Sequence, residues 1–230
     1  MQVCKDDNTN VRANFTADEF HSKSYDAPNC HFFSDICADL VQAVRSHFGV
    51  PIQVTSTHRT ILGNELVNGA STSQHLTGNA IDFKFVNNHD YYSQMMYDDF
   101  VCKGELYQEL VSLGLKGIGT YKTFWHFDDG NSDLNLRPVL TAWDKSEGKY
   151  GNVALTTDFF LSNSQGCPSI EQIDEFMHDN SITSWWNGLS GSDEDGIKSD
   201  KVKWYYVIAI SLFLGLVVYG IVKIRKRFGK

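Results

Sequence analysis

The chain has 230 residues, with 28 acidic and 20 basic side chains and a formal net charge of −8. Most of the imbalance lies in the body, because the last eight residues are rich in Lys and Arg and contain no acid. An acidic body argues against a nucleic-acid partner, since phosphate binding needs clustered Lys and Arg. Apolar residues make up 42% of the chain, which suits one folded domain with an appendage and excludes disorder.

Near the C-terminus, residues 204–222 form an apolar stretch without a single charge. At about 1.5 Å per residue, a helix of this length nearly covers the roughly 30 Å hydrocarbon core of a bilayer. Trp204 and Tyr219 lie close to the two ends, where aromatic residues favour the interfaces. The segment is therefore predicted to be a single transmembrane helix in contact with lipid. Residues 187–203, which are small, polar and charged, are predicted to be a flexible linker.

Two cues on membrane orientation conflict. The basic tail, residues 223–230, is expected on the cytoplasmic side, which places the acidic body on the non-cytoplasmic side. The N-terminus, however, lacks the apolar stretch of a signal peptide. We therefore expect either export driven by the membrane helix itself or a place in the membrane of a virus particle.

The cysteine pattern argues against a thiolate metal site. No CxxC spacing occurs, which argues against a zinc knuckle. Their number is odd, so at least one is unpaired in a monomer, and any disulfide requires the oxidising side of a membrane. The five residues are Cys4, Cys30, Cys37, Cys102 and Cys167.

Helical and strand signals come in separate groups along the chain. Ser34 is a candidate N-cap and Gly49 a candidate C-cap of a helix with one apolar stripe. The other predicted elements, in chain order, are an extended segment at 51–57, a long loop at 60–78, a strand at 79–86, helical residues at 91–113 with a break near Gly104, and a hairpin of strands at 117–121 and 124–128.

This grouping predicts an α+β fold with a small, mainly antiparallel sheet flanked by helices. The expected organisation is an N-terminal extension at 1–13, a main domain at 14–140, a C-terminal extension at 141–186 with an amphipathic helix from Pro168, and then the linker, the membrane helix and the tail.

Two predicted strands carry polar side chains that stand opposite an apolar face. The period of two puts Ile81, Phe83 and Phe85 on one face and Asp82 on the other. In the second strand, His126 and Asp128 share the face opposite Trp125 and Phe127. His75 precedes the first strand in a loop. If the strands are neighbours, His75, Asp82 and His126 converge.

Two imidazoles and one carboxylate are typical of a catalytic zinc site. Three protein ligands leave the fourth tetrahedral position to water, whose pKa zinc lowers towards about 7. Taken singly, each residue also has a simpler interpretation. His126 is then a hydrogen-bonded core histidine, Asp82 the wet side of an edge strand, and the spacing of His75 and Asp82 a coincidence.

The joint pattern resembles a known family. The segment Ser73-Gln-His75-Leu-Thr-Gly78-Asn-Ala80-Ile-Asp82 matches SxHxxGxAxD at every fixed position. Residues 124–128, Ser56 to Arg59 and the lead-in at 14–20 resemble three further elements in the right order. The chain is similar to the zinc D-Ala-D-Ala carboxypeptidases, which include phage endolysins and share the hedgehog/DD-peptidase fold.

By this resemblance, His75, Asp82 and His126 are the zinc ligands. Arg59 would bind the carboxylate of the substrate, a role that suits the two parallel donors of a guanidinium. Its simpler alternative is a surface ion pair. Ser73 would help to position the substrate, and its alternative is a cap or turn hydroxyl.

The chain departs from the family at two positions. Many members have an acid three residues before the second His as the general base, but here that residue is Thr123. Asp128, on the same strand face as His126, is the candidate substitute for catalysis; alternatively, it orients a ligand histidine through the ring N–H. Asp129 points to the wrong face for either role. His58 stands where an aromatic residue is more common before the Arg.

The resemblance implies a membrane-tethered zinc metallopeptidase that cleaves peptidoglycan stem peptides. The bond would be D-Ala-D-Ala or, for an endolysin, L-Ala-D-Glu. Because Thr123 replaces the usual acid, an inactive zinc-holding module that binds peptidoglycan is a second hypothesis. A virion or envelope structural protein is the third.

Overall fold

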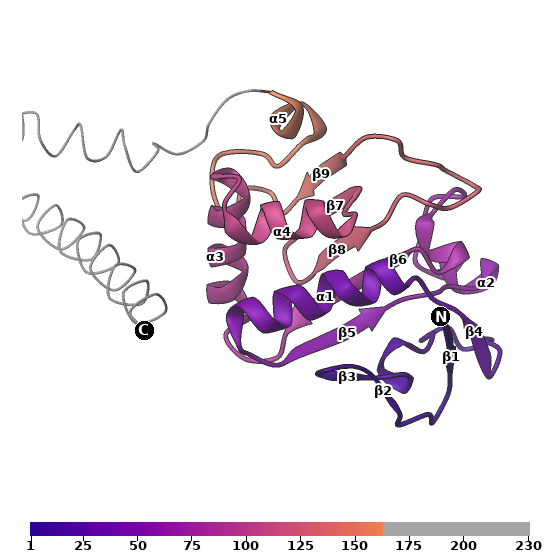
Figure 1. Ribbon diagram of the computed structural model, residues 1–230. Coiled ribbons are helices and arrows are strands. Elements are labelled where there is room, and N and C mark those ends of the chain that lie inside the picture. The colour runs from indigo at the N-terminus through magenta and orange to yellow at the C-terminus, as the bar shows by residue number, and fades with distance from the viewer. Residues whose placement is uncertain (163–230) are drawn as a thin grey trace, which may run out of the picture. The chain divides into compact units, whose positions relative to one another are not determined.

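The computed structural model describes residues 1–162, which lie within one compact unit (Figure 1). The predicted amphipathic helix from Pro168, the linker at 187–203, the membrane helix at 204–222 and the basic tail at 223–230 all lie outside the described residues. Among residues 1–162, no helix has the length and apolar character needed to cross a membrane.

A five-stranded sheet forms the centre of this unit. Its strands, in spatial order, are β5 (Ile52–Ser56), β6 (Ala80–Phe85), β8 (Trp125–Asp128), β7 (Gly117–Tyr121) and β9 (Thr141–Lys145). The first four pair in antiparallel fashion, and β9 alone runs parallel to its neighbour β7. The predicted α+β class with a mainly antiparallel sheet is therefore confirmed. β9 also shows that the sheet continues past residue 140, where a domain boundary was expected.

Helices cover one face of this sheet. Both α1 (Asp35–Phe48) and α3 (His89–Val101) contact β6, and α4 (Glu105–Leu113) packs against α1 (Figure 1). The predicted caps of α1 are present, because Ser34 Oγ accepts from the backbone N–H of Cys37 and Gly49 adopts the left-handed conformation with φ of 67°. These caps satisfy backbone groups that an isolated helix end leaves unpaired.

The segment 60–78 is not the continuous loop that its Gly, Asn, Ser and Thr content suggested. It contains α2 (Ile61–Leu66) and the 3-10 helix η2 (Gln74–Thr77). Both are nucleated locally, since Thr60 Oγ1 accepts from the N–H of Gly63 and Ser73 Oγ from that of His75. Such caps are stabilising, but helices this short carry no apolar periodicity that a sequence pattern could detect.

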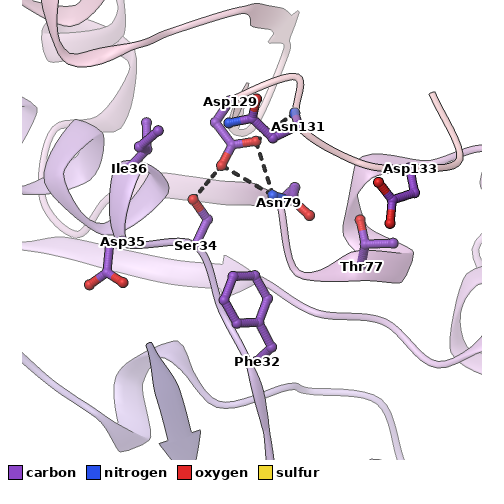
Figure 2. A pocket seen from close by; sticks show the side chains of 9 residues that line it. All are labelled: Phe32, Ser34, Asp35, Ile36, Thr77, Asn79, Asp129, Asn131 and Asp133. Atoms are coloured by element: carbon purple, nitrogen blue, oxygen red, sulfur yellow. Dashed lines mark hydrogen bonds between the residues drawn. The ribbon is translucent and has the colours of Figure 1, made fainter. Parts of the chain in front are cut away.

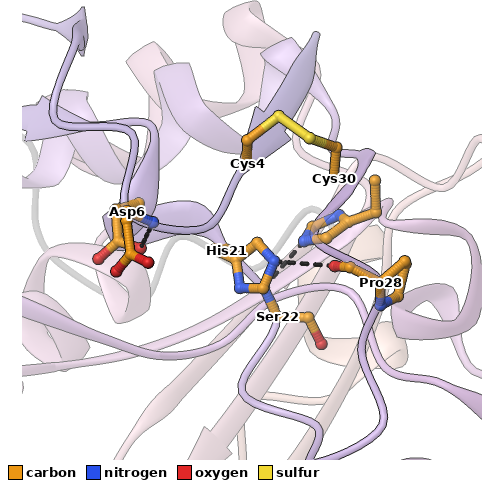
Figure 3. Close-up of a disulfide and its surroundings, with 8 residues drawn as sticks. Cys4, Asp6, His21, Ser22, Pro28 and Cys30 are labelled. Atoms are coloured by element: carbon orange, nitrogen blue, oxygen red, sulfur yellow. Dashed lines mark hydrogen bonds between the residues drawn. A yellow bond between two sulfur atoms is a disulfide. The ribbon is translucent and has the colours of Figure 1, made fainter.

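The N-terminal region forms two small antiparallel pairs. β1 (Gln2–Cys4) pairs with β4 (Cys30–Phe32), and a disulfide joins Cys4 to Cys30 across them (Figure 3). β2 (Asn10–Arg12) pairs with β3 (Phe15–Thr16), so this hairpin crosses the expected boundary after residue 13. The remaining described elements are η1 (Asp18–Phe20) and α5 (Thr157–Leu161). Cys37 is free and fully buried, as the odd cysteine count required of at least one residue.

The helix-covered face of the sheet builds the core. Phe83 of β6 and Phe127 of β8 make an edge-to-face contact with ring centroids 5.1 Å apart, and both are inaccessible to solvent. Trp125 also lies in this core, against Phe100 of α3. The predicted alternation is confirmed, and it leaves Asp82, His126 and Asp128 on the opposite face.

Three histidines stack between the N-terminal region and the end of β5. The ring of His31 lies 5.0 Å from that of His21 and 4.7 Å from that of His58. His31 Nε2 accepts from the N–H of Ser22, so this ring is neutral. Burial, with a smaller contribution from His31, lowers the pKa of His58 to about 4.

We expect acid to destabilise the protein through this stack. A histidine titrates near 6.5 in an unfolded chain, so the folded state disfavours the extra proton. The stability contributed by neutral His58 is full above pH 6.5 and is lost as the pH falls towards about 4. Urea unfolding between pH 8 and pH 4 would measure it. His58→Phe, which retains the ring but cannot titrate, should lose less stability on acidification than the wild type. An equal loss would contradict this assignment.

Candidate metal centre

The pairing of β6 with β8 places two candidate ligands opposite each other. Asp82 and His126 are direct partners in the antiparallel register. His126 Nδ1 lies 2.8 Å from Asp82 Oδ1. The side chains are buried, with side-chain exposures of 9% for His126 and 6% for Asp82. The predicted juxtaposition is therefore present in the folded chain.

His75 reaches the same point from η2. Its Nε2 lies 3.1 Å from Asp82 Oδ1 and 3.2 Å from His126 Nδ1. Its Nδ1 lies 2.5 Å from the carbonyl oxygen of Thr57. A carbonyl only accepts, so Nδ1 carries the proton and Nε2 presents a lone pair to the site. The carbonyl group of Thr57, directly after β5, thus determines the tautomer of His75.

His126 is oriented from the other side of its ring. Its Nε2 donates to Asp128 Oδ2 over 3.1 Å, which leaves Nδ1 directed at Asp82 and His75. Both histidines therefore place one ring nitrogen at the site and bind a protein oxygen with the other. Metal-binding histidines show this pattern, because the outer contact sets the ring orientation and raises ligand basicity.

Burial and mutual contacts shift the pKa of each of the three groups. Burial opposes ionisation of Asp82, but the neighbouring His75 and His126 outweigh it and hold the pKa of this carboxyl well below its usual range. Burial lowers the pKa of His75. Burial alone would also lower the pKa of His126, yet its bonds to Asp128 and Asp82 raise it to about 9.

Nitrogen and oxygen ligands of this kind fit a divalent cation. One ligand atom from each of His75, Asp82 and His126 lies within 4.8 Å of the others, and all three residues are buried. Two imidazoles with one carboxylate form a ligand set that zinc uses in peptidases, where it leaves one position open. A bound cation would accept one lone pair from each of these three residues.

Arg59 binds the second oxygen of the candidate carboxylate ligand. Its Nη2 lies 2.5 Å from Asp82 Oδ2, and its Nε donates to Ser56 Oγ over 2.9 Å. Arg59 thus forms an ion pair, but with a buried acid rather than at the surface. The guanidinium also lines the open cleft in front of the site. Arg59 can therefore orient Asp82 and still face a ligand.

Asp128 lies behind the His126 ring. The residue is inaccessible to solvent, Oδ1 accepts from the N–H of Gly130, and Oδ2 accepts from both His126 Nε2 and Arg137 Nη1. It contacts the ring nitrogen that points away from the site. Of the two roles considered for Asp128, this geometry favours the orientation of His126 over that of a general base.

Asp129 lies on the opposite side of the strand, as expected. It accepts from Ser34 Oγ, from the amide of Asn79 and from the N–H of Asn131 (Figure 2). These donors satisfy the buried carboxylate and join the start of α1 to the end of β8. The residue stabilises the fold away from the candidate metal centre.

Ser73 lines the cleft, whereas Thr123 lies outside its lining. Ser73 caps η2 through its contact with the N–H of His75 and also lines the cleft, so both of its predicted roles are compatible with the fold. Thr123 is exposed in the turn between β7 and β8. It supplies no acid to the site.

Arg137 is a site residue that the sequence analysis missed. It follows β8 in a loop, binds Asp128 and lies over the ring of Trp143 at 5.2 Å. Trp143 in turn lies 5.1 Å from the ring of His126. The sequence feature that could have indicated this group is the pair of glycines Gly117 and Gly119 in β7. A side chain at 117 would collide with Asp128 and Arg137, and one at 119 would collide with Trp143.

The candidate centre lies in a cleft of about 1030 Å³. The cleft is lined by α2 and the segment that follows it, and by the aromatic residues Tyr121, Phe124 and Trp143. Its charged lining, apart from the histidines, consists of Lys23, Arg59 and Arg137 with Asp82 as the one carboxylate among the described residues. In an acidic protein, this cleft favours an anionic ligand.

A family model described as Peptidase M15 matches residues 13–128, just over half of the chain. The chain belongs to the peptidase M15 family. Among curated proteins, none matches it by sequence. The matched range contains the candidate ligands and Arg59 and ends at Asp128, so Arg137 lies beyond it. Peptidases of this family are zinc-dependent, which agrees with the His-Asp-His group found here.

We expect Asp82→Ala to abolish stoichiometric metal binding. The change removes the one oxygen that both histidines approach. Full-length wild-type and variant protein, loaded with zinc and freed of excess ion, would be compared by elemental analysis. Asp90→Ala is the matched control, because it removes an exposed carboxylate that pairs with Lys149 outside the candidate ligand group. Equal zinc contents in the wild type and the Asp82→Ala variant would contradict this site.

Proposed function

We propose that this M15 family member is a zinc metallopeptidase that hydrolyses peptide bonds in peptidoglycan stem peptides. The observation that carries the proposal is the buried His75–Asp82–His126 group at the base of an open, cationic cleft. Family membership supports peptidase activity and the substrate class. His75, Asp82 and His126 would hold the zinc ion.

When bound, zinc supplies a Lewis acid that polarises a carbonyl oxygen and lowers the pKa of a water molecule. The chain itself contributes binding and orientation. Thr57 and Asp128 hold the two imidazoles through their outer ring nitrogens. Arg59 keeps Asp82 in place and presents its guanidinium to the carboxylate of the substrate. Tyr121 and Phe124, stacked at 4.2 Å, form an apolar wall.

Two bonds fit this arrangement, and digestion products would distinguish them. A D-Ala-D-Ala bond places a terminal carboxylate next to the scissile carbonyl. An L-Ala-D-Glu bond, the endolysin type, places an acidic residue there. Both offer an anion to the cationic cleft, so the proposal covers the stem peptide with either bond.

We also propose that residues 204–222 hold this unit at a bilayer, on the non-cytoplasmic side or in a virion membrane. The uncharged apolar segment and the basic residues after it support the anchor. The Cys4–Cys30 disulfide supports an oxidising compartment. A tethered peptidase of phage or bacterial origin would then act on the wall that it faces.

The second candidate is an inactive, metal-holding module that binds peptidoglycan. It is favoured by one observation: among the described residues, no carboxylate other than Asp82 lines the cleft, and Thr123 is exposed. The usual proton-accepting side chain is therefore lacking at this position. Intact stem peptides in the bound fraction of a sacculus pull-down would favour the module over the enzyme.

Digestion of purified sacculi by the full-length protein tests the two candidates. With zinc present, we expect release of stem-peptide fragments that a chelator stops, because the metal carries the chemistry. His75→Ala should lose this activity, while the exposed Lys149→Gln variant should keep it. If the wild type binds zinc and sacculi but releases no fragment, the peptidase proposal is wrong.

For a carboxypeptidase, we expect a preference for a free carboxyl terminus over its amide. Hydrogen bonds to charged groups contribute about 1.5–3 kcal/mol, so kcat/KM should differ by roughly 10- to 100-fold. Arg59→Gln should reduce this ratio, because it removes the cationic donor that also contacts the ligand Asp82. Arg12→Gln, which removes an equal charge outside the cleft lining, should leave the ratio intact. An unchanged ratio in Arg59→Gln would exclude the assigned role.

A further inference from the structure

Three side chains form a line of contacts that leads away from the candidate metal centre. His126 Nε2 donates to Asp128 Oδ2, and the same oxygen accepts from Arg137 Nη1. His126 and Asp128 come from β8, whereas Arg137 comes from the loop that follows it. The exposed fraction of the side chain falls from 15% at Arg137 to zero at Asp128. A buried carboxylate is thus enclosed between an imidazole and a guanidinium.

Two glycines of β7 leave the space that Asp128, Arg137 and Trp143 occupy. A Cβ atom at Gly117, opposite Asp128 in the β7–β8 register, would overlap both Asp128 Oδ2 and Arg137 Nη1. A Cβ atom at Gly119 would come within 2.7 Å of Trp143 Nε1. Arg137 is further held by its backbone N–H, which donates to Gly130 over 2.8 Å, and by its stacking on Trp143. The guanidinium is therefore held by Asp128 of β8 and Trp143 of β9, beside the space left by Gly117 of β7.

We propose that Arg137 is a positioning residue for the metal centre and acts through Asp128 on His126. The proposal rests on the proposed zinc site. Asp128 is inaccessible to solvent, and its Oδ2 accepts hydrogen bonds from both Arg137 Nη1 and His126 Nε2. Arg137 therefore holds the carboxylate group in place behind the imidazole. The carboxylate in turn orients the His126 ring, so that Nδ1 is directed at the proposed metal position.

Loss of Arg137 would have a different effect for each of the two possible roles of Asp128. If Asp128 only accepted a proton during turnover, loss of Arg137 would slow hydrolysis and leave zinc affinity unchanged. If Asp128 orients His126, loss of Arg137 weakens zinc binding even when no substrate is present. Outer contacts of this kind are worth about 10- to 100-fold in metal affinity.

The test measures the zinc dissociation constant of the full-length protein by competition with a chelator. We expect Arg137→Met to weaken zinc binding about 10- to 100-fold and to change the visible spectrum of the cobalt-substituted protein. Arg137→Lys, which retains a cation, should recover part of the loss. Arg12→Met is the matched control, since Arg12 has a similar side-chain exposure of 19% and pairs with Asp35 and Asp39 instead.

Gly117→Ala provides a second variant that leaves every charged residue in place. The added methyl group pushes Asp128 and Arg137 apart, so zinc affinity should fall here as well. Thermal unfolding of the metal-free variants would show that each is folded. Wild-type zinc affinity and an unchanged cobalt spectrum in both Arg137→Met and Gly117→Ala would overturn the proposal. Wild-type protein that binds zinc but releases no stem peptide would refute the peptidase function alone, and the role of Arg137 would stand.

Discussion

The candidate centre depends on the antiparallel register between β6 and β8. This register places Asp82 directly opposite His126 and, on the other face, packs Phe83 and Phe127 into the core. Since side chains alternate with a period of two, a slip by one residue would turn the Asp82 carboxylate towards the helices and an aromatic ring towards the cleft. The free energy of burying these rings therefore also maintains the distance between two ligands.

The buried carboxylates of this protein differ in the groups that compensate their charge. Asp82 is compensated by Arg59 and two imidazoles, and Asp128 by His126 and Arg137. Asp129 is instead satisfied by hydroxyl, amide and backbone N–H donors on the opposite face. Arg59 and Arg137, the two guanidinium partners, both line the cleft. As a result, an acidic protein presents a cationic cleft, which concentrates anionic peptides near the site.

Much of the fold was predictable wherever a local rule acts over many residues. Ser34 and Gly49 cap the two ends of α1 as expected, and the alternation in β6 and β8 identified the core face. The rule failed where elements are short. α2 and η2 depend on single capping hydroxyls, and β9 depends on a parallel partner that lies about twenty residues earlier in the chain. Neither feature produces a periodic pattern that can be recognised in one segment.

The sequence by itself determined the identities of the three candidate ligands, because strand alternation and a specific spacing motif are local properties of the chain. Only the tertiary structure decided what their neighbours do. Arg59 binds Asp82, Asp128 lies behind His126, and Arg137 joins them from a loop beyond the family match. Period and spacing tell which face a side chain occupies, whereas the atom that it contacts depends on the path of loops that bring distant residues together.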